Sequence, residues 1–113
     1  NPDLSNLSDK EKQMVINFLN QPILNNIEKG KIYKEFEFIS RQDNQSIHGI
    51  IDLMIEYDNY IDIIDYKLSH TDDHDYEVQL NRYRNYIQQK TNKKVNIYLY
   101  SILKNHIVKV EEK

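Results

Sequence analysis

The chain has 113 residues, of which 39% are hydrophobic and 29% charged, and its formal net charge is −3 at pH 7. The composition and length are typical of one soluble globular domain, which we place at residues 1–113. No apolar run approaches the ~20 residues of a membrane span, and no secretory signal is visible, so a membrane association is not expected. Cysteine is absent, which excludes thiolate metal sites and is consistent with a cytoplasmic location. The negative charge argues against a protein that coats nucleic acid.

The first predicted element is a helix. Ser8 and Glu11 form a capping-box pattern at its start, and apolar residues then recur at helical spacing as far as Leu19. Pro22 should interrupt this helix, and a second short helix should end at Gly30. The N-terminal segment is therefore expected to be helical in two pieces.

Strands dominate the rest of the chain. Residues 31–40 alternate, and two faces are expected: one with Ile32, Lys34, Phe36 and Phe38, the other with Tyr33, Glu35 and Glu37. The remaining elements follow in order: a turn at 41–45, strands at about 47–57 and 60–67, a helix at about 76–89, and strands at 94–102 and 106–110. The helix carries one stripe made of Tyr76, Leu80, Tyr83 and Ile87. The order predicts an α/β fold with a mixed central sheet flanked by helices.

Three charged residues lie within the apolar second and third strands. If the hairpin between these strands is centred on Asp58 and Asn59, the numbers of paired residues sum to 117, and Asp52 faces Asp65. Cβ atoms of such cross-strand neighbours are ~4.5–5.5 Å apart, where like charges are destabilising. Lys67 lies two residues beyond Asp65 and therefore projects from the same face. The hairpin is expected to bring all three groups together.

Two interpretations of this group are open. In the first, Lys67 offsets two carboxylates in a salt-bridged surface cluster. In the second, the carboxylates bind an oxygen-coordinated divalent cation, Mg²⁺ or Mn²⁺. The flanking residues favour the second interpretation, because a strand that is apolar on both faces is covered on both faces, and two half-buried carboxylates need more than one lysine.

Four short motifs occur in order along the predicted elements. They are Glu35…Phe38, Gly49-x-x-Asp52, Asp65-Tyr66-Lys67 and, on the helix, Gln79…Tyr83. Together they resemble the RecB/AddA-type exonuclease branch of the PD-(D/E)xK nuclease superfamily, over about residues 8–103. The resemblance implies a restriction-endonuclease-like core, and a metal-dependent deoxyribonuclease that hydrolyses DNA phosphodiester bonds.

The resemblance also assigns roles to the motif residues. Asp52, Asp65 and the carbonyl oxygen of Tyr66 would bind Mg²⁺ or Mn²⁺. Lys67 would position the attacking water and stabilise charge on the phosphate. Glu35 would support the site or its metal, although the same residue could be an ordinary surface charge.

Contacts with DNA are expected along and after the predicted helix. Gln79 and Tyr83 lie four residues apart on one helix face, where they would hold the active-site strands or contact the DNA strand, unless Tyr83 is simply core. The basic residues that could track phosphates are Arg82, Arg84, Lys90, Lys93 and Lys94. The nine tyrosines offer surfaces for stacking single-stranded bases, although most are expected in the core.

The histidines and the polar loop before the predicted helix are further candidates for metal ligands. His48 would lie ~13 Å along the strand from Asp52, too far to bind the same ion. The loop at 69–75, with two histidines and three aspartates, matches no calcium-loop spacing and is expected to be a solvated connector. The family uses a metal-binding histidine upstream of the Glu-x-x-Phe strand, and no histidine precedes His48 here. The family's usual threonine after Asp-Tyr-Lys is replaced by Leu68 and Ser69.

These observations lead to one main expectation and two alternatives. We expect an excised C-terminal nuclease domain of an AddA-like ATP-dependent helicase/nuclease that acts in double-strand break repair, weakly active or inactive in isolation. Its partners would be single-stranded DNA ends, the helicase domains of the parent chain and an AddB-like subunit. The alternatives are a catalytically idle domain of the same fold that binds DNA or a partner, and a stand-alone PD-(D/E)xK nuclease of the restriction or CRISPR-associated kind.

Overall fold

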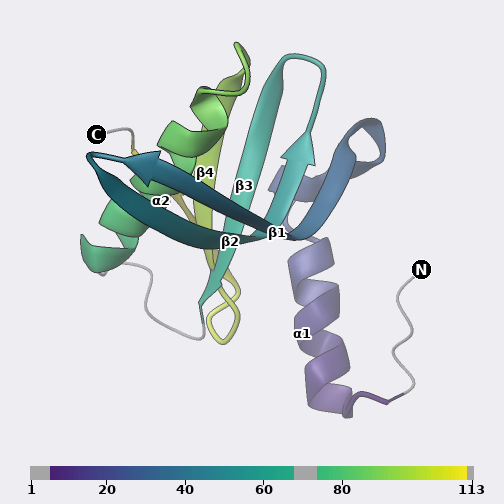
Figure 1. Ribbon diagram of the computed structural model, residues 1–113. Coiled ribbons are helices and arrows are strands. Elements are labelled where there is room, and N and C mark those ends of the chain that lie inside the picture. The colour runs from purple at the N-terminus through teal and green to yellow at the C-terminus, as the bar shows by residue number, and fades with distance from the viewer. Residues whose placement is uncertain (1–5, 68–73, 112–113) are drawn as a thin grey trace.

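A five-stranded mixed sheet forms the centre of the computed structural model, which describes residues 6–67 and 74–111 (Figure 1). The strands follow the order β1-β2-β3-β4-β5, and only β3 and β4 are parallel. The elements are α1 (Asp9–Leu19), the 3₁₀ turns η1 (Pro22–Leu24) and η2 (Ile27–Lys29), β1 (Lys31–Gln42), β2 (Gln45–Glu56), β3 (Tyr60–Lys67), α2 (His74–Gln88), β4 (Lys94–Ser101) and β5 (His106–Val110). Helix α2 lies in the crossover between the two parallel strands. The predicted α/β class and mixed sheet are confirmed.

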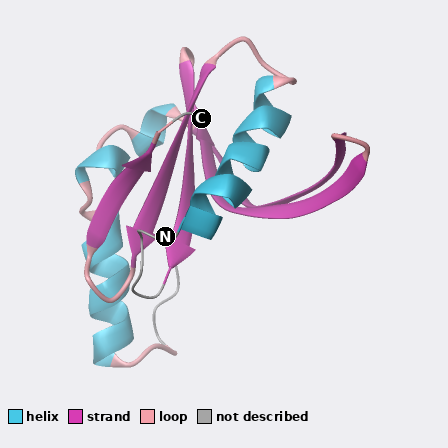
Figure 2. Cartoon of the chain, turned by 90° about the vertical axis from the view of Figure 1, so that its left-hand side faces the viewer, coloured by secondary structure: helices cyan, strands magenta, loops and turns pink. Residues whose placement is uncertain are grey.

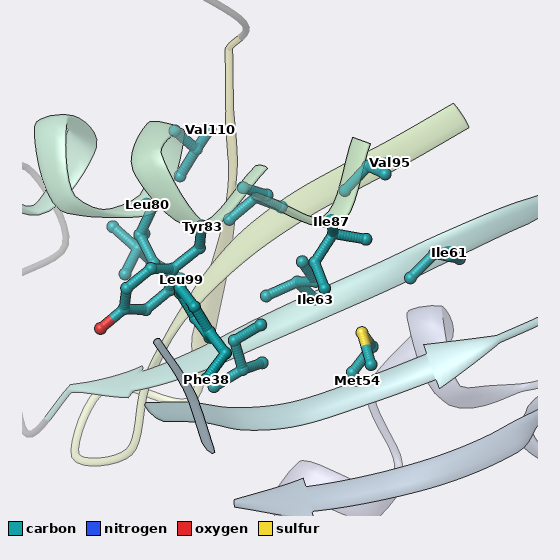
Figure 3. Close-up of a cluster of buried hydrophobic side chains, with 12 residues drawn as sticks. Phe38, Met54, Ile61, Ile63, Leu80, Tyr83, Ile87, Val95, Leu99 and Val110 are labelled. Carbon is teal, nitrogen blue, oxygen red and sulfur yellow. The ribbon is translucent and has the colours of Figure 1, made fainter. Parts of the chain in front are cut away.

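Helices cover the sheet on both faces, α2 on one and α1 on the other (Figure 2). The α2-side core joins apolar residues of all five strands to α2 and includes Ile63, Leu80 and Leu99 (Figure 3). The α1-side core includes Leu24, Ile64 and Tyr100. Residues 61–65 of β3 are all buried, which confirms that this strand is covered on both faces. Asp62 and Asp65 of β3 therefore lie in the buried part of the sheet.

The N-terminal helix begins as its sequence predicts. The Ser8 side chain accepts a hydrogen bond from the Glu11 backbone at 3.1 Å, and the Glu11 carboxylate accepts from the Ser8 backbone at 2.9 Å. After Pro22 the chain forms two short 3₁₀ turns instead of one second helix, and Gly30 caps the latter. Within the described ranges, no helix is long and apolar enough to cross a membrane.

In the β1–β2 hairpin, the alternation of side chains between the two faces of the sheet is interrupted halfway along each strand. The predicted regular alternation does not include this interruption. Glu35 has a positive φ of 50° and is the one residue of β1 with no paired partner in the ladder to β2. Tyr33 and Phe36 consequently pack against the same core, although strict alternation would put them on opposite faces. Strand β2 changes faces at the matching place, because Ile51 contacts the α2-side core and Leu53 the α1-side core.

The register is the same on both sides of this interruption, so Glu35 stands opposite Asp52. Beyond it the β1–β2 hairpin curves away from the rest of the sheet (Figure 2). A positive φ is uncommon for a residue other than glycine, and such residues cluster at functional sites. The change of face therefore occurs at one of the two predicted metal-binding aspartates.

Gly49 leaves room for two aromatic rings that connect this hairpin to α2. A Cβ atom at Gly49 would lie 2.6 Å from Cζ of Phe38 and 2.7 Å from Cε1 of Tyr83. The two rings meet edge to face, with centroids 5.3 Å apart. Figure 3 shows the Tyr83 ring extending from α2 toward Phe38. The glycine is thus required for the close approach of α2 to β2.

Gly49→Ala is expected to destabilise the domain by about 1–3 kcal/mol, the usual cost of forcing extra volume into a packed core. The free energy of unfolding, measured by denaturant titration, checks this expectation. Ser46→Ala, at an exposed position of the same strand, serves as the control. An unchanged free energy for Gly49→Ala would mean that the two rings can separate without loss.

Candidate active site

The second hairpin brings Asp52 and Asp65 together as the predicted register requires. Four pairs, from Glu56 with Ile61 to Leu53 with Ile64, have numbers that sum to 117. The next pair in this register would be Asp52 with Asp65, but the regular ladder ends before it. The two strands part at that point, and the carboxylates lie where they separate. The turn geometry at Asp58 and Asn59 therefore decides the composition of the site.

A backbone hydrogen bond fixes Asp52 in this position. Its Oδ2 atom accepts from the backbone N–H of Tyr66 at 2.9 Å. The carboxylate thus takes the place of a carbonyl oxygen in the ladder between β2 and β3. The Tyr66 ring points to the other side, where it meets the ring of Phe18 edge to face at a centroid distance of 5.3 Å.

Asp65 and Lys67 form a close ion pair on the α2 side. Lys67 Nζ lies 2.9 Å from Asp65 Oδ2, and the side chains are 20% and 9% exposed. The Oδ2 atom is buried, and the Lys67 ammonium is the one close partner that the structure shows for it among the described residues. Buried carboxylates are costly unless they are paired, and a single ammonium next to two carboxylates leaves room for a further cation.

The electrostatics of the three groups follow from this packing. Burial, opposed by the Lys67 ammonium and reinforced by the adjacent Asp52 carboxylate, raises the pKa of Asp65 to about 6. Burial tends to lower the pKa of Lys67, but the contact with Asp65 outweighs it and the pKa is raised overall. Lys67 is therefore a cation at neutral pH.

The donor set fits an oxygen-coordinated divalent cation in part. Two neighbouring carboxylates supply the negative charge and hard oxygen atoms that Mg²⁺ and Mn²⁺ prefer. Among the residues that the structure describes, no three histidine or acidic side chains lie close enough to hold a metal ion together. Glu35 stands opposite Asp52 in register but is exposed, and its carboxylate does not join the pair. Water or substrate oxygens would have to complete the coordination.

Tyr83 connects α2 to the edge of this site. Tyr83 is buried, and its hydroxyl group forms a hydrogen bond with the backbone of Ile50. Ile50 lies two residues before Asp52. Burial and the nearby Asp65 carboxylate both raise the pKa of Tyr83. Gln79 lies one turn earlier on α2 and is exposed. Tyr83 is thus both a core residue and a contact that holds β2 against α2, whereas Gln79 faces outward.

A groove of about 370 Å³ lies between β2 and α2 next to Tyr83. Its lining includes His48, Gln79 and the exposed Arg82. Arg82 is the one residue of the predicted basic set found at this groove.

The other basic residues of the predicted set lie elsewhere. Arg84 is buried, and its guanidinium donates to the carbonyl oxygen of Val110 at 2.9 Å. Its predicted contact with phosphates is therefore wrong for this conformation, because the charge is committed to the end of β5. Lys93 binds Glu56 at 2.9 Å. Lys94 pairs with Tyr60 at the opposite end of β3 from Asp65.

Lys90 lies just beyond the C-terminal end of α2, with its ammonium 5.4 Å from the centre of the Tyr86 ring. This is the end of the crossover helix nearest the start of β4, away from Asp65. Lys90, Lys93 and Lys94 therefore gather at the far end of the sheet. A DNA strand seated at the carboxylates would need to extend along the sheet to reach them.

His48 is engaged outside the carboxylate pair. Its Nε2 atom lies 2.8 Å from Glu37 Oε2, and both side chains are largely exposed. This agrees with the expectation that His48 does not bind the same ion as Asp52. The predicted connector at 69–75, together with Leu68, lies outside the described residues, except that the backbone of 74 and 75 begins α2.

One neighbour of the site was expected only as a core residue. Tyr76, in the first turn of α2, places its ring 4.0 Å from the Lys67 ammonium. In the sequence Tyr76 belongs to the apolar stripe of the helix. The sequence feature that could have indicated this contact is the position of Tyr76 in the first turn of the crossover helix, the next element after the strand that carries Lys67.

The metal-free domain should gain stability when the Asp52 charge is removed. Because Asp65 ionises near pH 6 in the folded chain and near its usual value of 3.8 when unfolded, folding loses stability as the pH rises through this interval. Asp52→Asn keeps an acceptor for the Tyr66 N–H and removes the repulsion. We expect a gain of ~0.2–1 kcal/mol at pH 7 and a smaller gain at pH 4.

Denaturant unfolding in the presence of a chelator, at both pH values, tests this result. Asp58→Asn, at an exposed position of the β2–β3 turn, is the matched control. A clear loss of stability at pH 7 would favour the salt-bridged cluster over the metal site.

Comparison with known proteins identifies two sequences that are similar to this chain. Two curated proteins from strains of Clostridium kluyveri, each named as one component of an ATP-dependent helicase/nuclease, are 35% identical to this chain over 94 residues. The chain is similar to a segment of these helicase/nuclease proteins. The match covers 77% of this chain and 8% of the length of either relative. It supports the relationship to AddA-type helicase/nucleases that the four motifs predict. No family model matches the chain.

Proposed function

We propose that this domain is a metal-dependent deoxyribonuclease, the exonuclease domain of an AddA-like ATP-dependent helicase/nuclease that acts in double-strand break repair. The observation that carries the proposal is the buried Asp65 carboxylate, which lies next to the Asp52 carboxylate with the Lys67 ammonium as its close cationic partner. Buried carboxylates in contact are costly unless a cation binds them. A divalent cation next to a lysine can activate a water molecule and stabilise the charge that develops on a phosphodiester during hydrolysis.

In this proposal Asp52, Asp65 and the carbonyl oxygen of Tyr66 hold Mg²⁺ or Mn²⁺. The cation, when bound, lowers the pKa of water and offsets the charge of the phosphate. The backbone N–H of Tyr66 keeps Asp52 oriented while its carboxylate binds. Lys67, a cation at neutral pH, orients the attacking water and stabilises the charge that develops on the phosphate oxygens.

The groove beside Tyr83 is the proposed path of the DNA strand toward the carboxylates. Gln79 and Arg82 are exposed along α2, where an amide and a guanidinium can contact phosphate or sugar. Tyr83 lines this groove, interacts electrostatically with the Asp65 carboxylate and holds β2 through Ile50. We propose single-stranded ends as substrate. The partners of the whole protein would be its helicase domains and a second, AddB-like protein.

The present chain should be a weak enzyme. Mg²⁺ requires six oxygens in near-ideal geometry, and the described residues bring only two carboxylates together. Waters can complete the coordination, but a loosely held cation is misplaced relative to the phosphate. Displacement by ~1 Å can cost ~100-fold in rate.

A digestion assay tests the proposed function. The chain is incubated with end-labelled single-stranded DNA, and separately with RNA of the same sequence, in the presence of Mg²⁺, Mn²⁺ or a chelator. We expect slow cleavage of the DNA with either metal, none with chelator, and none by Asp65→Asn. Cleavage that survives the chelator or the substitution would contradict the proposal. DNA binding without any cleavage, at all metal concentrations, would instead identify a catalytically idle domain.

A further inference from the structure

The Lys67 side chain has two neighbours of different kinds. Its ammonium contacts the Asp65 carboxylate at 2.9 Å and lies 4.0 Å from the centre of the Tyr76 ring. A cation over the face of a tyrosine within about 6 Å is attracted by the ring quadrupole, more strongly when both are shielded from water. Lys67 is 20% exposed, so this contact is partly shielded.

The ring is held independently of the lysine. Tyr76 belongs to the first turn of α2 and packs against the α2-side core, to which Leu80 and Tyr83 of the same helix stripe also belong. Its position therefore follows from the packing of the crossover helix. Lys67, by contrast, ends β3 and carries four rotatable bonds, so without a second contact its ammonium would sample many positions.

The two contacts respond differently to the proposed chemistry. A cation bound by Asp65 competes with Lys67 for the same carboxylate and repels its ammonium. The ion pair between Lys67 and Asp65 is therefore the contact that weakens when a divalent cation binds. The Tyr76 ring is uncharged and does not compete for the cation, so its attraction for the ammonium remains.

We infer that Tyr76 is a positioning residue that holds the Lys67 ammonium beside the carboxylate pair through its ring face. The ring does not touch the substrate in this arrangement. Its contribution is to limit the positions of the one side chain that is expected to reach the water and the phosphate.

The contact can be tested without any nuclease activity. In the metal-free protein, NMR of the lysine side chains should show ring-current upfield shifts of the Lys67 Cε protons and nuclear Overhauser contacts from them to the Tyr76 ring. Tyr76→Phe keeps the ring and should keep the shifts, whereas Tyr76→Leu keeps apolar bulk and should lose them. Ordinary lysine shifts in the wild-type protein would overturn the inference, and this measurement needs no variant to fold.

A second, kinetic test of the inference rests on the proposed function. With Mg²⁺ or Mn²⁺ present, Tyr76→Leu should lower kcat roughly tenfold with little change in KM, and Tyr76→Phe should restore it. Wild-type kcat in Tyr76→Leu, or equal loss in the Phe and Leu variants, would overturn the positioning role. If Lys67→Ala were fully active while the NMR contact was present, the proposed function would fail and the contact itself would stand.

Discussion

Replacing Asp65 by alanine is expected to abolish the binding of Mn²⁺ and Mg²⁺, with an affinity at least ~100-fold weaker than that of the wild-type chain. The reason is that its carboxylate is buried next to that of Asp52, so the pair carries two negative charges against the one ammonium of Lys67. Asp52→Ala should have the same effect, because its carboxylate supplies the second oxygen ligand from the neighbouring strand.

Calorimetric titration and thermal unfolding with and without metal measure this loss. A ligand that binds only the folded state at 100 times its Kd adds ~2.7 kcal/mol to the free energy of unfolding, and the alanine variants should gain none of it. Asp62→Asn is a well-matched control. Asp62 is buried on the same strand but packs toward the opposite face, where its Oδ1 accepts from Asn96 at 3.1 Å. Unchanged metal affinity in both alanine variants would refute the ligand assignment.

The second large effect is expected from Lys67→Ala. If its ammonium stabilises the charge on the phosphate, its removal should lower the rate of DNA cleavage by ~10²–10³-fold. Metal affinity should be retained or raised, because the variant removes a cation that competes for Asp65. Single-turnover cleavage and metal titration of the same preparation separate these two consequences.

Lys29→Ala is the control for the loss of one lysine, since Lys29 is exposed next to Tyr60 at the opposite end of β3 and its loss should leave cleavage unchanged. A variant at Lys67 that cleaves normally, or one that loses metal binding together with activity, would contradict the assigned role.

The hairpin register and the site it creates could be predicted from the sequence. Turn residues at Asp58 and Asn59 fix the pairing of β2 with β3, and a period of two then determines which side chains share a face. The same local rules placed Lys67 beside Asp65. The capping box of α1 was equally local and equally predictable.

The features that the sequence did not reveal depend on long-range packing. Nothing in the alternation of β1 indicates that Glu35 adopts a positive φ and that both strands change faces beside it. Arg84 was predicted to contact phosphates because it is a basic residue on the helix, but its guanidinium is buried against the end of β5. Tyr76 has a core periodicity, and only the return of α2 across the sheet brings its ring to Lys67.

The central claim is that Asp52 and Asp65 bind one divalent cation where β2 and β3 part. The most direct test is a Mn²⁺ titration of the uniformly ¹⁵N-labelled chain, followed by the loss of amide signals near the paramagnetic ion. We expect the amides of Asp52, Asp65, Tyr66 and Lys67 to broaden first and together. Initial broadening around Glu37 and His48, or scattered over the acidic surface, would contradict the claim.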